Sequence, residues 1–436
     1  MRKIIIPQEA IDRHEATLGR ALMGYLKCLA GGQTVRLVKD GRQSYQATTW
    51  EEKRYWNWVL AEFTDKDFIS ARPGILLAFA KKNTEHFGLI DPRSKKCLSK
   101  RQKSMLAVTQ ALFNFGAFRS GAVLAPCAST CRTIQWVTLP LIRPRKRNKR
   151  YLANKAVVDA WKGWSLAEFV RLLDVRYCPY CNAETVGVVY AESPSEKNSF
   201  SALDHILPKS DYPLLALSLY NLVPACYRCN SQFKGEKDGF DLEHWDASEP
   251  FKALHPYAHN IYKWFRFDYR PTAVEHLFLK PRDKDSPLTV TRRIPLKKGG
   301  RKKSSAFYLE RVGNHLEEYR LLNAYRDLYA MEINAILKME MICTPTFVAL
   351  MRGRYPYLAD EDFNLVFRRA SLVPDEINYH RFGKLIIDLN RQIGDGGLFA
   401  ALQNEKGVQV DLKAIDAAWE ARKCVIEERV RERFAL

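Results

Sequence analysis

Apolar residues recur at helical spacing along the first third of the chain. Within 8–30 these positions are Ile11, Leu18, Leu22, Tyr25 and Leu29. Intervals of three to four residues are typical of one helix face, and the glycines at 31 and 32 favour an end there. Thr49 and Glu52 have the spacing of a capping box ahead of a second helix over 51–63. The pattern predicts further helices over 73–84 and 100–115, and a loop over 116–132.

The middle of the chain follows a different pattern. The segments 185–190 and 200–206 are rich in β-forming residues, which predicts two short extended pieces. Loose alternation over 261–269 favours a small β extension within 245–294. The short apolar run 137–142 fits either a strand or a buried connector.

Helical spacing also precedes and follows this middle segment. It predicts helices over 153–173, 309–339, 361–370, 374–393 and 412–433. We therefore expect an α+β protein with a mainly helical N-terminal region (1–160), a mixed middle region (161–295) and a helical C-terminal region (296–436).

The charge balance points to a polyanionic partner. The chain has 436 residues and a net charge of +20, from 69 Lys and Arg against 49 Asp and Glu. Six basic residues fall within 143–150: Arg143, Arg145, Lys146, Arg147, Lys149 and Arg150. Such a run also imitates a nuclear localisation signal, but the overall charge favours phosphate contact. A second basic cluster occupies 297–303.

The apolar runs favour a cytoplasmic protein. None approaches the roughly 18 residues of a membrane span, and the apolar run at the start is too short for a signal peptide. Ten cysteines fit a reducing compartment if four of them bind metal and the others are free thiols. Cys127 and Cys131 form a CxxxC pattern without a nearby partner pair, so we expect a structural role for them.

Four cysteines have the spacing of a zinc site. Cys178 and Cys181 form one CxxC pair, and Cys226 and Cys229 form another. Each short loop can place two sulfurs on one side of an ion, and two such loops complete a tetrahedron. The pattern predicts a structural Zn²⁺ held by all four.

Between and directly after these pairs stand polar residues in a recognisable order. Asp204-His205 lies in the run Asp-His-Ile-Leu-Pro-Lys, Asn221 in Asn-Leu-Val-Pro, and Asn230 directly follows Cys229. Singly, each has an ordinary structural explanation, as a turn acceptor or a helix cap. Their order between two metal-binding pairs favours a catalytic site.

This stretch of about 60 residues resembles the HNH endonuclease family. The resemblance implies a central zinc-bound ββα-metal unit in which His205 is the general base and Asn221 orients it. It also implies that Asp204 and Asn230 bind a catalytic Mg²⁺ or Mn²⁺; some members have histidine at the last position. Lys209 and Lys234, within the same motifs, join the basic run as candidate phosphate contacts.

The chemistry agrees with those roles. Histidine, with an ordinary pKa of about 6.5, is suited to deprotonating water near neutral pH. A divalent ion held by a carboxylate and an amide oxygen neutralises charge on the phosphate and the leaving oxygen. We therefore expect a metal-dependent endonuclease acting on DNA, or on RNA.

The motif spacing is similar to that of HNH nucleases of bacterial anti-phage systems, the Septu type and its retron-linked relatives. In those systems a separate ATPase regulates the nuclease, so a regulatory ATPase is an expected partner. Two alternatives stay open: a zinc-dependent nucleic-acid-binding module without catalysis, and an intron or mobile-element nuclease. The sequence predicts neither the cleavage specificity nor the oligomeric state.

Overall fold

The computed structural model describes most of the chain in segments. These are residues 2–37, 43–66, 69–86, 98–125, 127, 132–138, 164–189, 199–235, 252–269, 288–293, 305–329 and 374–394, with a few positions between 334 and 357. The chain divides into two compact units. The first contains residues 1–265, 292–321 and 373–384; the second contains 266–291, 322–372 and 385–436.

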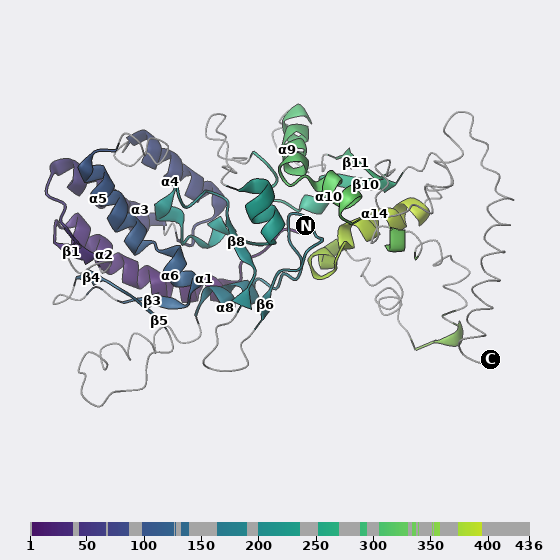
Figure 1. Ribbon diagram of the computed structural model, residues 1–436, viewed down its shortest axis with the longest axis horizontal. Helices are drawn as coiled ribbons and strands as arrows, with labels where there is room; N and C mark the ends of the chain where they lie inside the picture. Colours follow the sequence, from purple (N-terminus) through teal and green to yellow (C-terminus); the bar gives the residue numbers. More distant parts are fainter. Residues whose placement is uncertain are drawn as a thin grey trace. The chain divides into compact units, whose positions relative to one another are not determined.

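The N-terminal region is helical, as the apolar spacing predicts. Three successive elements, α1 (Gln8–His14), the π-helical η1 (Glu15–Gly19) and α2 (Arg20–Ala30), form one continuous run that ends at Gly31. The next helix, α3 (Trp50–Lys66), begins at the predicted capping box and lies beside α2 (Figure 1). In that box the Thr49 hydroxyl accepts from the Glu52 amide, and Glu52 accepts from the Thr49 amide. Buried Tyr55, Trp56, Val59 and Phe63 form its inner face.

Two further helices complete this helical layer, and the segment after them differs from the prediction. Helices α4 (Pro73–His86) and α5 (Lys100–Leu112) lie close to the expected ranges. The segment expected to be a loop instead contains α6 (Phe115–Arg119) and strand β3 (Ala122–Leu124). Asn114 caps α6 by accepting from the Ala117 amide. The burial of Phe115 and Phe118 explains why a glycine-rich stretch forms a helix here.

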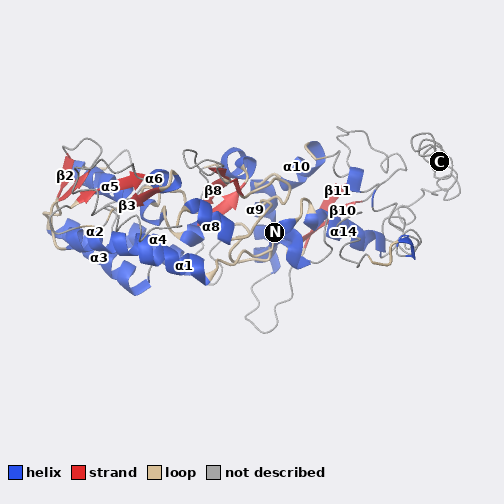
Figure 2. Cartoon of the chain, turned by 90° about the horizontal axis from the view of Figure 1, so that it is seen from below, coloured by secondary structure: helices blue, strands red, loops and turns tan. Residues whose placement is uncertain are grey.

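Short strands accompany these helices (Figure 2). Strand β3 pairs antiparallel with β5 (Trp136–Thr138), which decides the open choice at 137–142 in favour of a strand for its first residues. A second small sheet has the order β2 (Gln43–Tyr45), β1 (Val35–Leu37) and β4 (Thr133–Ile134).

The middle region is built on a β-hairpin followed by a helix. Strand β8 (Ala202–His205) pairs antiparallel with β9 (Leu222–Ala225), and His205 stands opposite Leu222. The π-helical turn η6 (Arg228–Lys234) follows and ends at Gly235, whose φ is +58°. Around it lie α8 (Leu166–Leu172), the pair β6 (Val188–Val189) and β7 (Ser199–Phe200), and the short 3₁₀ turns η4 (Pro213–Leu215), η5 (Leu219–Asn221) and η7 (Ile261–Lys263). This strand–strand–helix order agrees with the expected mixed middle region.

The long helix expected over 309–339 is interrupted. Helix α9 (Ser305–Glu318) ends before Arg320, whose φ of +45° is incompatible with a continuing helix, and α10 (Leu321–Asp327) begins directly after it. The predicted helix over 374–393 is a 3₁₀ turn, η10 (Pro374–Tyr379), followed by α14 (Gly383–Gly394). Each helix is therefore shorter than the apolar spacing suggested.

The second unit contains the predicted β extension. Strand β10 (Phe265–Tyr269) pairs with β11 (Leu288–Arg292). The Phe267 amide donates to the Asp388 carboxylate at 2.8 Å, and the Phe267 ring stacks on Tyr325 with centroids 4.6 Å apart. These contacts attach strand β10 to α14 and α10.

Several predictions lie outside the described residues. They are the basic run 143–150, the first part of the helix over 153–173, the cluster 297–303, the helices over 361–370 and 412–433, and both expected region boundaries. None of the helices in the described part of the chain combines the length and apolar character needed to cross a bilayer.

Candidate active site and metal centre

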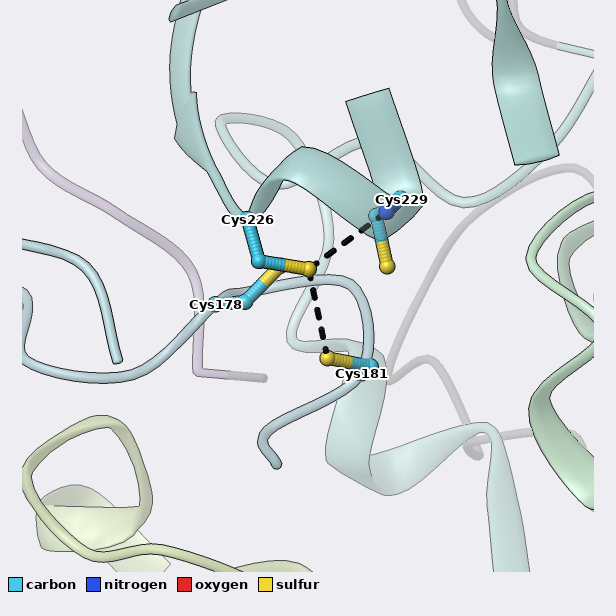
Figure 3. Close-up of side chains that lie close together, drawn as sticks. All are labelled: Cys178, Cys181, Cys226 and Cys229. Atoms are coloured by element: carbon cyan, nitrogen blue, oxygen red, sulfur yellow. Dashed lines mark hydrogen bonds between the residues drawn. The ribbon is translucent and has the colours of Figure 1, made fainter. Parts of the chain in front are cut away.

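The four predicted cysteines meet in one buried cluster (Figure 3). Their Sγ atoms all lie within 4.8 Å of one another, and those of Cys181 and Cys226 are 3.9 Å apart. The first pair lies on a loop, whereas Cys226 directly follows β9 and Cys229 lies on η6. Strand β9 and the helical turn η6 thus place Cys226 and Cys229 against the loop that holds Cys178 and Cys181.

The cluster fits a zinc ion. Sulfurs about 2.3 Å from a tetrahedral Zn²⁺ lie about 3.8 Å from one another, close to the separation seen here. Although burial raises it, hydrogen bonds from Cys181, Cys226 and Cys229 hold the pKa of the Cys178 thiol well below its usual value, whereas the same hydrogen-bond network raises the pKa values of Cys181 and Cys229. A thiolate is the metal-binding form of cysteine. Geometry and chemistry therefore support a four-cysteine metal centre, as the CxxC spacing predicted.

Asp204 and His205 are consecutive on β8 and have separate surroundings. Successive side chains of a strand point to opposite faces. Both residues are buried, with exposed fractions of 1% for Asp204 and 9% for His205.

The Asp204 carboxylate accepts two strong hydrogen bonds. The phenol of Tyr180 donates to Oδ2 at 2.7 Å, and the ammonium of Lys234 donates to Oδ1 at 2.9 Å. Lys234 also donates to the backbone carbonyl of His205 at 2.8 Å. The bond from Lys234 makes this carboxylate one half of a buried ion pair.

The His205 ring is held by a backbone carbonyl and an aromatic ring. Its Nε2 lies 3.0 Å from the Ala216 carbonyl oxygen, and Phe115 of α6 packs edge to face against it at 4.4 Å. Burial lowers the pKa of His205 to about 3, and the nearby ammonium groups of Lys209 and Lys234 contribute to the decrease. The imidazole is therefore neutral at physiological pH. Because the carbonyl can only accept, the neutral ring carries its proton on Nε2 and its lone pair on Nδ1.

The side chain of Asn221 does not contact the His205 ring and instead bonds to backbone groups. Its amide donates to the carbonyls of Leu207 and Leu215 and accepts from the Leu207 amide, at 2.7 to 3.1 Å. The carbonyl of Ala216, rather than Asn221, contacts the imidazole. Asn221 nevertheless ties down the residue before Ala216, so any influence on His205 passes through the backbone.

Asn230 lies on η6 together with Lys234 and is partly buried. Its backbone N–H donates to the Cys226 carbonyl, and its backbone carbonyl accepts from the Gly235 N–H. The cysteine cluster and the turn at Gly235 therefore fix the backbone of Asn230. A carboxylate and an amide oxygen are hard ligands of the kind that Mg²⁺ and Mn²⁺ prefer. The donor types of Asp204 and Asn230 thus fit such an ion.

The candidate phosphate contacts divide into two cases. Lys234 does not suit that role in this arrangement, because its side chain is 3% exposed and its ammonium is bonded to Asp204 and His205. Lys209 lines a cleft of about 260 Å³, together with Asn114, Phe115 and Ala216. Its ammonium lies 4.9 Å from the Phe115 ring centroid, and burial together with Arg119 lowers its pKa. The six basic residues of 143–150 lie outside the described part of the chain.

Tyr180 contacts Asp204 and Phe115 contacts His205, and the sequence did not indicate either contact. Tyr180 stands inside the first CxxC pair, so its proximity to the cluster was visible but its bond to Asp204 was not. Phe115 lies far from His205 along the chain, at the last position of the helix predicted over 100–115. No periodic signal could have placed that ring against the histidine.

Comparison with known proteins identifies the same segment. Residues 178–234 match the family model described as HNH endonuclease. No curated protein and no solved structure matches the chain. The match spans the four cysteines, Asp204, His205, Asn221 and Asn230, and implies a nuclease domain in the middle of the chain.

Proposed function

We propose that this protein is a metal-dependent HNH endonuclease that hydrolyses phosphodiester bonds of DNA. The observation that carries the proposal is the placement of His205 within the HNH segment: the Ala216 carbonyl orients its imidazole, and the buried carboxylate of Asp204 precedes it in the chain. A general base needs a lone pair, a defined orientation and a pKa near the working pH. The fold supplies the first two, and the negative charge of a bound phosphate would raise the pKa of His205 from its value of about 3.

In this proposal His205 takes the proton from the attacking water at Nδ1. The bond from Nε2 to Ala216 O keeps the proton on the far nitrogen, so Nδ1 is the acceptor in every neutral molecule. Phe115 restricts rotation of the ring. Lys234, bonded to the His205 carbonyl, holds the end of β8 in place.

Asp204 and Asn230 would hold the Mg²⁺ or Mn²⁺ ion of this site. Such an ion, when bound, neutralises charge on the phosphate and on the departing 3′ oxygen. The chain's own contribution is to orient the Asp204 carboxylate, through the hydrogen bonds that Tyr180 and Lys234 donate to its two oxygens.

The substrate assignment follows from charge. A net charge of +20 favours a nucleic-acid polyanion, and Lys209 lines a cleft with Phe115 and Ala216, the two residues that contact the His205 ring. We favour DNA because the HNH description applies to endonucleases that act on it, and RNA is the other outcome of the test.

A biological role in bacterial anti-phage defence, with a regulatory ATPase and a cytoplasmic site of action, rests on motif spacing alone. The supporting residues are Asp204-His-Ile-Leu-Pro-Lys and Asn221-Leu-Val-Pro with the cysteine pair that follows. Co-purification from the native operon tests the partner: an ATPase retained through the column supports this role.

A zinc-dependent binding module without catalysis is the second candidate. The observation in its favour is the buried Lys234–Asp204 ion pair, which balances the charge of Asp204 within the protein. In this case the chain would bind nucleic acid and leave it intact.

Plasmid nicking separates the two candidates. We expect Mg²⁺- or Mn²⁺-dependent nicking that EDTA stops, and a decrease of about two to four orders of magnitude in His205→Ala with DNA binding retained. Asp204→Ala and Asn230→Ala should lose activity as well, with partial rescue by excess ion for these two only. His380→Ala, which removes a 3.6 Å contact between the imidazole Nε2 and the Glu376 carboxylate, is the matched control. Nicking by His205→Ala at the wild-type rate would contradict the mechanism, and the assay includes the co-purified partner if one is found.

A further inference from the structure

The two donors to Asp204 come from the two halves of the cysteine cluster. Tyr180 stands between Cys178 and Cys181, and Lys234 ends the same helical turn that carries Cys229. Each CxxC segment therefore delivers one hydrogen bond to the same carboxylate, Tyr180 to Oδ2 and Lys234 to Oδ1.

Burial and stacking fix the position of the Tyr180 hydroxyl, which donates to Asp204. The residue is 1% exposed, and its ring stacks on Tyr319, the residue directly after α9, with centroids 4.2 Å apart and planes 14° apart. The Tyr180 hydroxyl lies 2.7 Å from Asp204 Oδ2, and because a carboxylate oxygen accepts, the phenol is the donor of this bond. A ring held in this way presents its one hydrogen to Oδ2.

Lys234 completes the arrangement from the other side. Its ammonium joins Asp204 Oδ1 to the His205 carbonyl, with distances of 2.9 and 2.8 Å. Truncating it would leave a buried charge without its counter-ion, which is strongly destabilising. Tyr180 is the better probe, because its hydroxyl can be removed while its ring stays.

We propose that Tyr180 is a positioning residue: through its phenol the cysteine cluster sets the orientation of the Asp204 carboxylate that binds the divalent ion. This proposal deepens the function proposed above and rests on its assignment of Asp204 as an ion ligand. A ligand held within a fraction of an ångström binds an ion more tightly than one that must be ordered first. The cluster then contributes to ion affinity in addition to folding.

The test is Tyr180→Phe, which removes one oxygen and keeps the stacked ring. Zinc content should stay at the wild-type value, and the melting temperature should fall only by the amount that the loss of one buried hydrogen bond produces. Mn²⁺ affinity, measured by titration without DNA, should fall about tenfold. The ion concentration for half-maximal cleavage should rise by the same factor, while the rate at saturating ion changes less than twofold. Tyr227→Phe is the matched control, because Tyr227 stands in the second CxxC pair and is 69% exposed.

A double-mutant cycle tests the contact without ion binding or activity. Tyr180→Phe, Asp204→Asn and the double variant are compared by denaturant unfolding, and we expect a non-additivity of about tenfold in the unfolding constant. Additive effects, unchanged Mn²⁺ affinity, or loss of zinc from Tyr180→Phe would overturn the proposal. The cycle keeps its meaning if the wild type fails to cleave nucleic acid, an outcome that counts against the nuclease function alone.

Discussion

Asp204 and His205 are neighbours in the chain, yet they depend on different parts of the protein. The contacts of Asp204 come from Tyr180 and Lys234, both inside the segment 178–234. The His205 ring rests against Phe115, which belongs to the N-terminal helical region, and bonds to the carbonyl of Ala216.

The same N-terminal region reaches the next carbonyl along the chain. His14 of α1 lies 2.9 Å from the Leu217 oxygen, and burial lowers its pKa to about 4. Two buried, neutral histidines therefore hold consecutive carbonyls of one turn. The Asp204 side is self-contained within the nuclease segment, whereas the N-terminal helices build part of the His205 side.

The largest effect should come from breaking the cysteine cluster. Cys178→Ser should remove zinc and destabilise the segment 178–234, because a structural zinc site contributes on the order of 10 kcal/mol to folding. Zinc analysis, thermal melting and hydrogen exchange measure this change, and Cys28→Ser, outside the cluster, is the control. A variant without zinc that melts and cleaves like the wild type would contradict the assignment.

Acid should lower the free energy of unfolding through the buried histidines. His14, His205 and His315 are buried with pKa values lowered to about 4, 3 and 3. The unfolded chain takes up protons below about pH 6.5 and the native protein does not, so stability should fall as the pH decreases from 6.5 towards 4. Each histidine contributes about 1.4 kcal/mol per pH unit.

Denaturant unfolding at several pH values measures this slope. His14→Gln, which cannot take up a proton in that range, should reduce the slope by the share of one histidine. An unchanged slope in this variant would mean that His14 is not a buried neutral group.

Removing the Phe115 ring that packs against His205 should affect catalysis without affecting ion binding. Phe115→Leu loses the edge contact with His205, so we expect cleavage to slow about tenfold through loss of ring orientation. Mn²⁺ affinity should stay unchanged, because Asp204 has separate supports. Phe118→Leu on the same helix, whose ring faces His14 and Trp136, is the control. Equal losses of activity in the two variants would assign Phe115 to stability alone.

The smallest effect should come from replacing Lys209 in the cleft, which should change DNA affinity. Lys209→Gln should weaken DNA binding for all sequences and reduce the slope of log affinity against log salt by about 0.9, the value for one phosphate contact. Lys27→Gln, at an exposed position of α2, should leave the slope unchanged. Equal slopes for Lys209→Gln and the wild type would exclude Lys209 from the interface.

Much of the candidate site could be predicted because its signals are local. Two CxxC pairs bring four sulfurs together through short loops, and the order Asp204, His205, Asn221 and Asn230 follows one hairpin and one helical turn. The helices 8–30 and 51–63 were also predictable, since apolar spacing and a capping box act within a few residues.

The tertiary structure decided what surrounds these residues. Tyr180 and Lys234 bond to Asp204 across separations of 24 and 30 residues, and Asn221 turned out to hold backbone rather than the imidazole. Phe115 covers His205 because a glycine-rich segment folds into α6 when its two phenylalanines are buried. A contact between distant residues depends on how whole elements pack, and hydrophobic spacing along the chain specifies the buried face of an element without specifying what lies against it.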